Sequence, residues 1–232
     1  MTTPYSTTTG RARFLLLGDS HAGAVGRAAR AAGLPFAGGP TGSGRDFLGP
    51  FFDPRGADDI TFRDAEAERL YRGFLDTLDT RALGRLTVPL VCTFGLSVHT
   101  VATAANWSVH RDTEGAYTPG FLTSALFGDL VRATARGALA FYDRAAALGL
   151  RTLALLPPQR VPGMADPRVF FAAQDVLHEE LRARGVETVD LRAHVASADG
   201  LQRPAFCEPD DTIHGSLAFG RLVVAALLDR GV

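Results

Sequence analysis

The chain has 232 residues, of which 46% are hydrophobic and 21% charged, and its formal net charge is −1. This length suits one domain with a substantial core, and the balanced charge gives no electrostatic case for nucleic acid or an anionic membrane as a partner. No apolar run approaches the roughly 18 residues that a membrane span needs. The chain contains no lysine, which excludes a P-loop lysine, a protein-kinase lysine and a pyridoxal Schiff base.

The first dozen residues, MTTPYSTTTGRA, lack the charged start and the apolar stretch of a signal peptide. We therefore expect a disordered tip over residues 1–12, one domain over residues 13–232, and a cytoplasmic protein. Cys92 and Cys207 do not make a disulfide framework. Cys92 lies inside the apolar run TVPLVCTF, so we expect it in the core.

Apolar runs alternate with helical patterns along the chain. Buried strands are expected over residues 13–18, 34–39, 87–95, 151–158 and 186–191. Helices are expected over residues 21–33, 64–83, 119–149, 167–185 and 215–228. The connections include a glycine-rich loop at 38–47, a long segment at 96–118, and a loop with a short turn at 192–211. Five strands separated by helices predict an α/β protein with a parallel sheet and helices on both faces.

Serine, aspartate and histidine residues follow the expected strands. In open α/β sheets, ligands bind beyond the carboxyl ends of the strands, and these residues therefore share one edge of the predicted sheet. They are Asp19, Ser20 and His21 after the first strand, Ser97 and His99 after the third, and Asp211 and His214 after the fifth. The sequence predicts a site at this edge.

The stretch Asp19-Ser20-His21 allows three interpretations: a helix cap, one wall of a metal site, or a nucleophile. The spacing Asp211-Thr-Ile-His214 favours the third. An Asp three residues before a His can accept a hydrogen bond from one imidazole nitrogen, which leaves the other nitrogen free to take a proton from a hydroxyl. Ser20 needs such a base, and the helix that follows it offers backbone N–H groups where an oxyanion would form.

GDSH at Gly18–His21, together with DxxH at Asp211–His214, resembles the motifs of the SGNH, or GDSL-type, hydrolase superfamily. The GDSH variant is also similar to the SGNH domains associated with sugar acyltransferases. The resemblance spans nearly the whole chain and implies a three-layer, flavodoxin-like fold. It also implies that Ser20 is the nucleophile, His214 the base, and Asp211 the partner that orients the base.

The resemblance further implies an oxyanion hole with three hydrogen-bond donors. Two of them are backbone N–H groups, one from Ser20 and one from a glycine in the second block. Gly42 and Gly44, in the stretch GGPTGSG, are the candidates for that glycine. A glycine suits this role because it has no side chain to keep the backbone away from the substrate.

The third donor is the point where this chain departs from the pattern. The resemblance implies an asparagine two residues after the glycine that ends the third strand. Here that glycine is Gly95 and the residue is Ser97. The donor is then Ser97, His99 or Asn106, which is the sole asparagine of the chain. Loss of one oxyanion donor can reduce the rate roughly 100- to 1000-fold.

We expect a serine esterase that acts on a small acyl ester, for instance an O-acetyl group on a sugar or another small metabolite, without a metal or a cofactor. An acyltransferase with the same acyl-enzyme and a non-catalytic binding protein are the alternatives. A metal-dependent phosphoesterase is excluded, because its Gly-Asn-His block cannot exist where Asn106 is followed by Trp107. A dinucleotide is not expected, because GDSHAG lacks the G-x-G-x-x-G spacing.

Arg160 lies just beyond the two prolines that end the fourth expected strand. A guanidinium at that position could bind a carboxylate or a phosphate of the substrate. The simpler interpretation is a surface ion pair.

Overall fold

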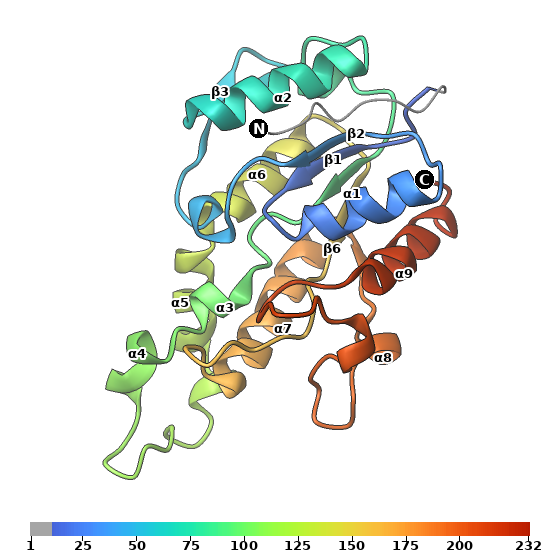
Figure 1. Cartoon of the computed structure of the whole chain (residues 1–232). Helices are drawn as coiled ribbons and strands as arrows, with labels where there is room; N and C mark the ends of the chain where they lie inside the picture. The colour runs from blue at the N-terminus through green and yellow to red at the C-terminus, as the bar shows by residue number, and fades with distance from the viewer. Residues whose placement is uncertain (1–10) are drawn as a thin grey trace.

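The computed structural model describes residues 11–232, and its centre is a five-stranded parallel sheet (Figure 1). The strands are β1 (Leu15–Gly18), β2 (Ala37–Pro40), β5 (Leu90–Cys92), β6 (Thr152–Leu155) and β7 (Glu187–Val189). They lie in the order β2-β1-β5-β6-β7. Numbered along the chain, these parallel strands have the flavodoxin-like order 2-1-3-4-5. The predicted fold class is confirmed.

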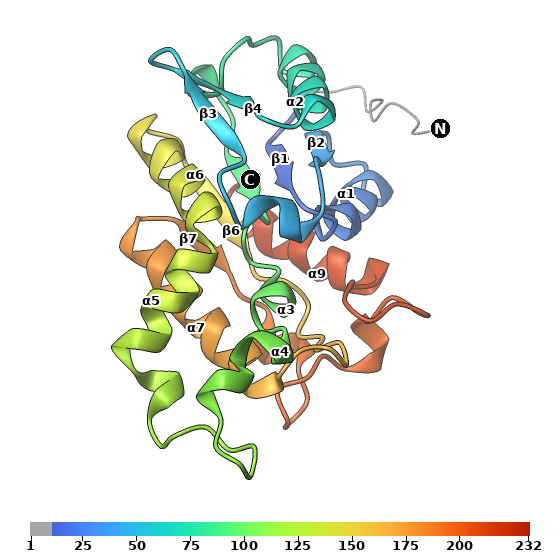
Figure 2. The same cartoon turned by 90° about the vertical axis from the view of Figure 1, so that its left-hand side faces the viewer.

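Helices form a layer on each face of the sheet (Figure 2). In chain order they are α1 (Ala22–Ala31), α2 (Ala65–Thr77), α3 (Val98–Val101), α4 (Ala104–Trp107), α5 (Ala125–Thr134), α6 (Arg136–Ala147), α7 (Pro167–Ala183), α8 (Arg192–Val195) and α9 (Leu217–Leu228). Helices α1 and α9 pack together on one face, whereas α2, α5, α6 and α7 contribute to the core on the other.

Strand β1 contributes side chains to both cores. Leu15 and Leu17 belong to the cluster that contains Phe141 of α6. Leu16 belongs to the cluster that contains Val25 of α1. Successive side chains of a strand point to opposite faces of a sheet, so a strand covered on both faces is apolar at every position. This explains the continuous apolar run that precedes the motif GDSH.

The helix predicted over residues 119–149 is in fact two helices, α5 and α6. The Gly137 N–H donates to the Leu48 carbonyl at 2.8 Å, whereas in one continuous helix it would donate to the carbonyl four residues earlier, which lies in α5. A Cβ at residue 137 would lie 1.8 Å from the Gly49 carbonyl oxygen, so the approach of this loop requires glycine. The break depends on a distant segment, and local periodicity therefore does not reveal it.

Helix α2 ends at Thr77, earlier than the predicted end of the helix over residues 64–83. Asp79 adopts a left-handed conformation with φ 52°. The Thr80 N–H then donates to the Leu75 carbonyl at 3.0 Å. This is a C-terminal cap of the kind that glycine usually provides, and an aspartate in its place gives a weaker signal in the sequence.

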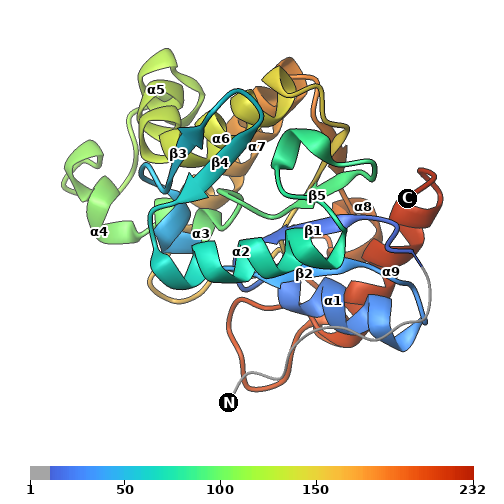
Figure 3. The ribbon, with the colours of Figure 1, turned by 90° about the horizontal axis from the view of Figure 1, so that it is seen from above.

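The structure contains an antiparallel hairpin that the sequence analysis missed, formed by β3 (Phe52–Arg55) and β4 (Asp59–Phe62). Pro54 weakens the strand signal, whereas Gly56, with φ 60° in the turn, is the signal that could have revealed it. The hairpin lies beside α6 (Figure 3), and the Arg144 guanidinium donates to the carbonyls of residues 56, 57 and 59.

The long segment at 96–118 contains α3 and α4, and the loop at 192–211 contains α8. Cys92 is buried in β5, as predicted, and burial raises its pKa. Across residues 11–232, no helix is both long and apolar enough to cross a membrane. Residues 1–10 of the predicted disordered tip lie outside the described residues.

Candidate active site

Ser20 lies at the turn where β1 ends and α1 begins. Strand β1 has β2 on one side and β5 on the other. This is the point in a doubly wound sheet where the strand order reverses and where ligands bind. Ser20 is half-buried and precedes the first turn of α1, whose N-terminal end favours negative charge. The fold therefore places a hydroxyl where an anionic group is stabilised.

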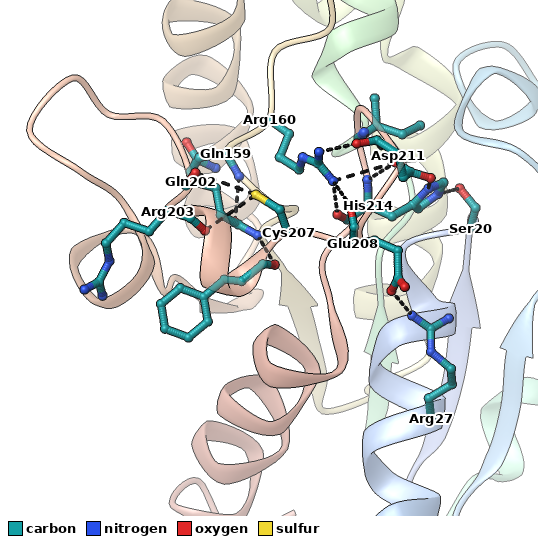
Figure 4. A network of polar contacts seen from close by, with 12 residues as sticks. Ser20, Arg27, Gln159, Arg160, Gln202, Arg203, Cys207, Glu208, Asp211 and His214 are labelled. Carbon is teal, nitrogen blue, oxygen red and sulfur yellow. Dashed lines mark hydrogen bonds and ion pairs between the residues drawn. The ribbon is translucent and has the colours of Figure 1, made fainter.

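His214 lies between Ser20 and Asp211 (Figure 4). Its Nε2 is 2.7 Å from the Ser20 Oγ, and its Nδ1 is 2.7 Å from Asp211 Oδ2. Asp211 Oδ1 accepts hydrogen bonds of 2.7 Å from the backbone N–H groups of Ile213 and His214. The aspartate thus holds the ring and the backbone that carries it, which leaves Nε2 to take a proton from the hydroxyl.

The Asp211 carboxyl is kept ionised by its hydrogen bonds. Burial alone would raise its pKa. The hydrogen bonds from the His214 ring and from the two backbone N–H groups outweigh burial, so the pKa of Asp211 lies well below its ordinary value. The carboxylate therefore stays charged across the neutral range. A charge at this position would stabilise the imidazolium if His214 took a proton.

Asp19 is fully buried and fixes the turn that carries the serine. Its carboxylate accepts hydrogen bonds from the Thr93 hydroxyl at 2.9 Å, from the His21 N–H at 3.0 Å, and from the Ser97 hydroxyl. Its own N–H donates to Thr93 Oγ1 at 3.0 Å. A Cβ at Gly18 would lie 1.9 Å from Thr93 Oγ1, so the glycine leaves room for the Thr93 hydroxyl, which follows β5.

Of the two glycines predicted for the oxyanion hole, Gly44 is the one beside the site. A Cβ at Gly44 would lie 2.4 Å from Ser97 Cβ, whereas a Cβ at Gly42 would lie 2.9 Å from the Phe47 ring. Within residues 11–232, neither the Ser20 N–H nor the Gly44 N–H donates to a protein acceptor. Both are backbone donors that an oxyanion can use.

The three candidates for the third donor have different surroundings. The Ser97 hydroxyl donates to Asp19 and is already engaged. Asn106 is exposed on α4, which leads away from the sheet (Figure 1), and its side chain makes no hydrogen bond within the described chain. His99 lies on α3 beside the site, because its ring centroid is 6.1 Å from that of His21. The structure therefore favours His99 and does not bring Asn106 to the site.

Two further imidazoles accompany His214. The His21 ring centroid is 5.1 Å from that of His214 and 6.1 Å from that of His99. Burial lowers the pKa of His21, which is only 5% exposed. Burial, assisted by the neighbouring His21, lowers the pKa of His99 to about 4. Both rings are therefore neutral at neutral pH, and a neutral imidazole retains one N–H donor.

Arg160 forms an ion pair, as the simpler interpretation predicts, but its partner is Asp211 of the site and its surroundings are largely buried. Its side chain is 16% exposed, and its guanidinium faces the segment of residues 208–214, which we call the DxxH loop (Figure 4). It donates to backbone carbonyls of that loop and lies 3.9 Å from Asp211 Oδ1. Every residue has a carbonyl, so the sequence contains no signal for such a contact.

Comparison with solved structures places the fold. A GDSL-like lipase from Bacteroides thetaiotaomicron matches 95% of this chain and 87% of its own length, with a TM-score of 0.50 and 15% identity. The chain has the SGNH hydrolase fold. A lipase/acylhydrolase from Enterococcus faecalis matches 94% of this chain and 94% of its own length, with a TM-score of 0.44 and 14% identity. No protein-family model and no curated protein matches the sequence. The resemblance predicted from GDSH and DxxH is confirmed for the SGNH fold.

Proposed function

We propose that this protein is a serine hydrolase of carboxylic esters. The observation that supports it best is the line of hydrogen bonds from Ser20 through His214 to Asp211, in which each link is 2.7 Å. Helix capping does not account for these residues. Helix α1 has no side-chain cap, and α9 is capped by Ser216.

The reaction proceeds through an acyl-enzyme on Ser20. His214 takes the hydroxyl proton as Oγ attacks the ester carbonyl, and the oxyanion accepts hydrogen bonds from the Ser20 and Gly44 N–H groups. The intermediate collapses, and the alcohol leaves with the proton from His214. His214 then takes a proton from water, the hydroxide attacks the acyl group, and the carboxylic acid leaves as the proton returns to Ser20.

His99 serves as the third donor in this proposal. Its pKa of about 4 keeps the ring neutral at neutral pH. A neutral ring can donate one N–H to an oxyanion without placing a permanent positive charge beside His214. Such a charge would oppose protonation of His214 when it acts as the base.

The substrate in this proposal is a small acyl ester, such as an O-acetyl group on a sugar. The residues around Ser20 are small or polar, and they include Gly44, Ser97 and His99. Such surroundings suit a short, polar ester better than a long acyl chain. The GDSL-like lipase that shares the fold supports an ester as the reacting group.

Labelling with a fluorophosphonate tests the proposed nucleophile. We expect a single adduct on Ser20 by mass spectrometry, and no adduct in the Ser20→Ala variant. The same variant should lose roughly 10⁴-fold or more in kcat on p-nitrophenyl acetate, as single triad deletions do. If the wild type carries no adduct on Ser20, and Ser20→Ala hydrolyses the ester as fast as the wild type, the proposal is wrong.

A further inference from the structure

The DxxH loop lacks the anchors that hold most of the site. None of residues 208–214 is fully buried, so the hydrophobic core does not fix them. The Glu208 N–H donates to the His214 carbonyl at 3.1 Å, which closes the loop at its base. Asp210 takes a left-handed conformation with φ 57°. A loop of this kind needs a polar anchor if it is to keep Asp211 and His214 in line with Ser20.

Arg160 provides that anchor. One terminal nitrogen of its guanidinium donates to the carbonyls of Glu208 at 3.1 Å and His214 at 2.7 Å. The other donates to the Asp211 carbonyl (Figure 4). A planar guanidinium holds several acceptors in a fixed geometry, which a lysine cannot do. The carbonyls of both triad residues in the loop are therefore held by one side chain.

The anchor itself is attached to the segment that leads into the loop. The Gln159 N–H donates to Gln202 Oε1 at 3.1 Å, and the Gln202 N–H donates to the Gln159 carbonyl at 2.8 Å. Gln202 Nε2 also donates to the Phe206 carbonyl at 2.7 Å. These bonds join the backbone beside Arg160 to the chain just before the DxxH loop, so the arginine and the loop keep a fixed relation.

We propose that Arg160 is a positioning residue that holds the DxxH loop in the conformation in which Asp211 and His214 line up with Ser20. The hydrogen bonds of its guanidinium are to loop carbonyls, and it acts on the reaction only through the two triad residues. Its effect on turnover rests on the proposed function, whereas its effect on the loop does not. The experiment therefore needs one readout of each kind.

The kinetic test compares Arg160→Met with Arg144→Met. Arg144 is a matched control, because its guanidinium also binds three backbone carbonyls, in the hairpin far from the serine. We expect Arg160→Met to lower kcat on p-nitrophenyl acetate roughly 10- to 100-fold, since small misplacements of catalytic groups cost about that much. KM should change less than about twofold, because the hydrogen bonds of this guanidinium are to loop carbonyls. Arg144→Met should keep the wild-type kcat.

Two further variants, Arg160→Lys and Arg160→Ala, test whether the effect on kcat depends on the guanidinium group itself. The lysine variant keeps the charge but cannot hold several carbonyls in a fixed geometry, so its kcat should fall between the wild type and Arg160→Met. Added guanidinium should restore part of the kcat of Arg160→Ala and none of that of Arg160→Met, in which the site is filled. A folded Arg160→Met variant with the kcat of Arg144→Met would overturn the proposal.

Amide hydrogen exchange tests the loop without any assay of activity. The Ile213 and His214 amides donate to Asp211 and should be protected in the wild type and in Arg144→Met. Arg160→Met, or Arg160→Lys if the first variant does not fold, should lose this protection. Unchanged protection would refute the role of Arg160. If Ser20 takes no fluorophosphonate label, only the proposed function fails, and the exchange result still decides the role of Arg160.

Discussion

The two halves of the site are held in place in opposite ways. On the nucleophile side, Asp19 is buried at the end of β1, and the hydroxyls of Thr93 and Ser97, in the segment after β5, satisfy its carboxylate. On the other side, no residue of the DxxH loop is buried, and Arg160 binds its backbone carbonyls. A residue that directly continues a strand takes its position from the sheet. A residue on a long loop needs an anchor of its own.

Among the variants that compare the two halves, Asp211→Asn should give the largest loss of turnover. The amide cannot stabilise the imidazolium and favours the wrong tautomer of His214, so kcat should fall roughly 10⁴-fold. Initial rates on p-nitrophenyl acetate measure it. Asp210→Asn is the matched control, since Asp210 is exposed and asparagine tolerates its left-handed backbone. Equal losses in both variants would contradict the assigned triad.

His99→Ala should have the next largest effect, and it tests the nucleophile side. Loss of an oxyanion donor should lower kcat roughly 100-fold. The same assay on Asn106→Ala provides the control, because Asn106 is exposed on α4 and should be dispensable. A normal kcat in His99→Ala together with a reduced kcat in Asn106→Ala would mean that the loop rearranges to bring Asn106 to the serine.

The pH dependence of stability provides a separate check on the state of His99. Its pKa is about 4 in the folded protein, against an ordinary value of 6.5. Between these values the unfolded chain binds a proton that the folded protein does not, so the free energy of unfolding falls as the pH falls from 6.5 to 4. Urea unfolding of His99→Gln should show a weaker fall than the wild type. An identical fall would show that His99 takes up its proton in the folded protein over the same pH range as in the unfolded chain.

The contrast between the halves also explains what the sequence could predict. GDSH and DxxH are short motifs whose side chains carry the proposed chemistry, and each comes after a strand of the sheet, so Ser20, Asp211 and His214 could be predicted to meet. The sheet could be predicted because the strand sequences are apolar throughout. These features are local in the sequence and depend on residue type.

The features that were missed depend on backbone contacts between distant segments. The break between α5 and α6 arises because Gly137 binds the carbonyl of Leu48. Arg160 binds three carbonyls of a loop far along the chain. A carbonyl belongs to every residue, so no pattern of residue types marks its partner. The choice of Gly44 over Gly42 likewise depends on which neighbour, Ser97 or Phe47, each one faces.

Thr93→Val should have the smallest effect on turnover and a clear effect on stability. Its hydroxyl accepts the Asp19 N–H and donates to the Asp19 carboxylate. Valine has a similar shape but leaves both buried groups without that partner, so the free energy of unfolding should fall by about 1–3 kcal/mol. Urea unfolding measures this loss. Thr77→Val is the control, because the Thr77 hydroxyl donates to a helix carbonyl at an exposed site.

The kcat of Thr93→Val separates the two modes of support. Ser97 and the His21 N–H still hold the Asp19 carboxylate in this variant, so the turn should keep its shape and kcat should fall less than tenfold. Arg160→Met removes all three guanidinium hydrogen bonds to the carbonyls of the DxxH loop at once, so it should reduce kcat more for a similar loss of stability. A larger fall in kcat for Thr93→Val than for Arg160→Met would show that the buried half, despite its several braces, is the less tolerant of the two.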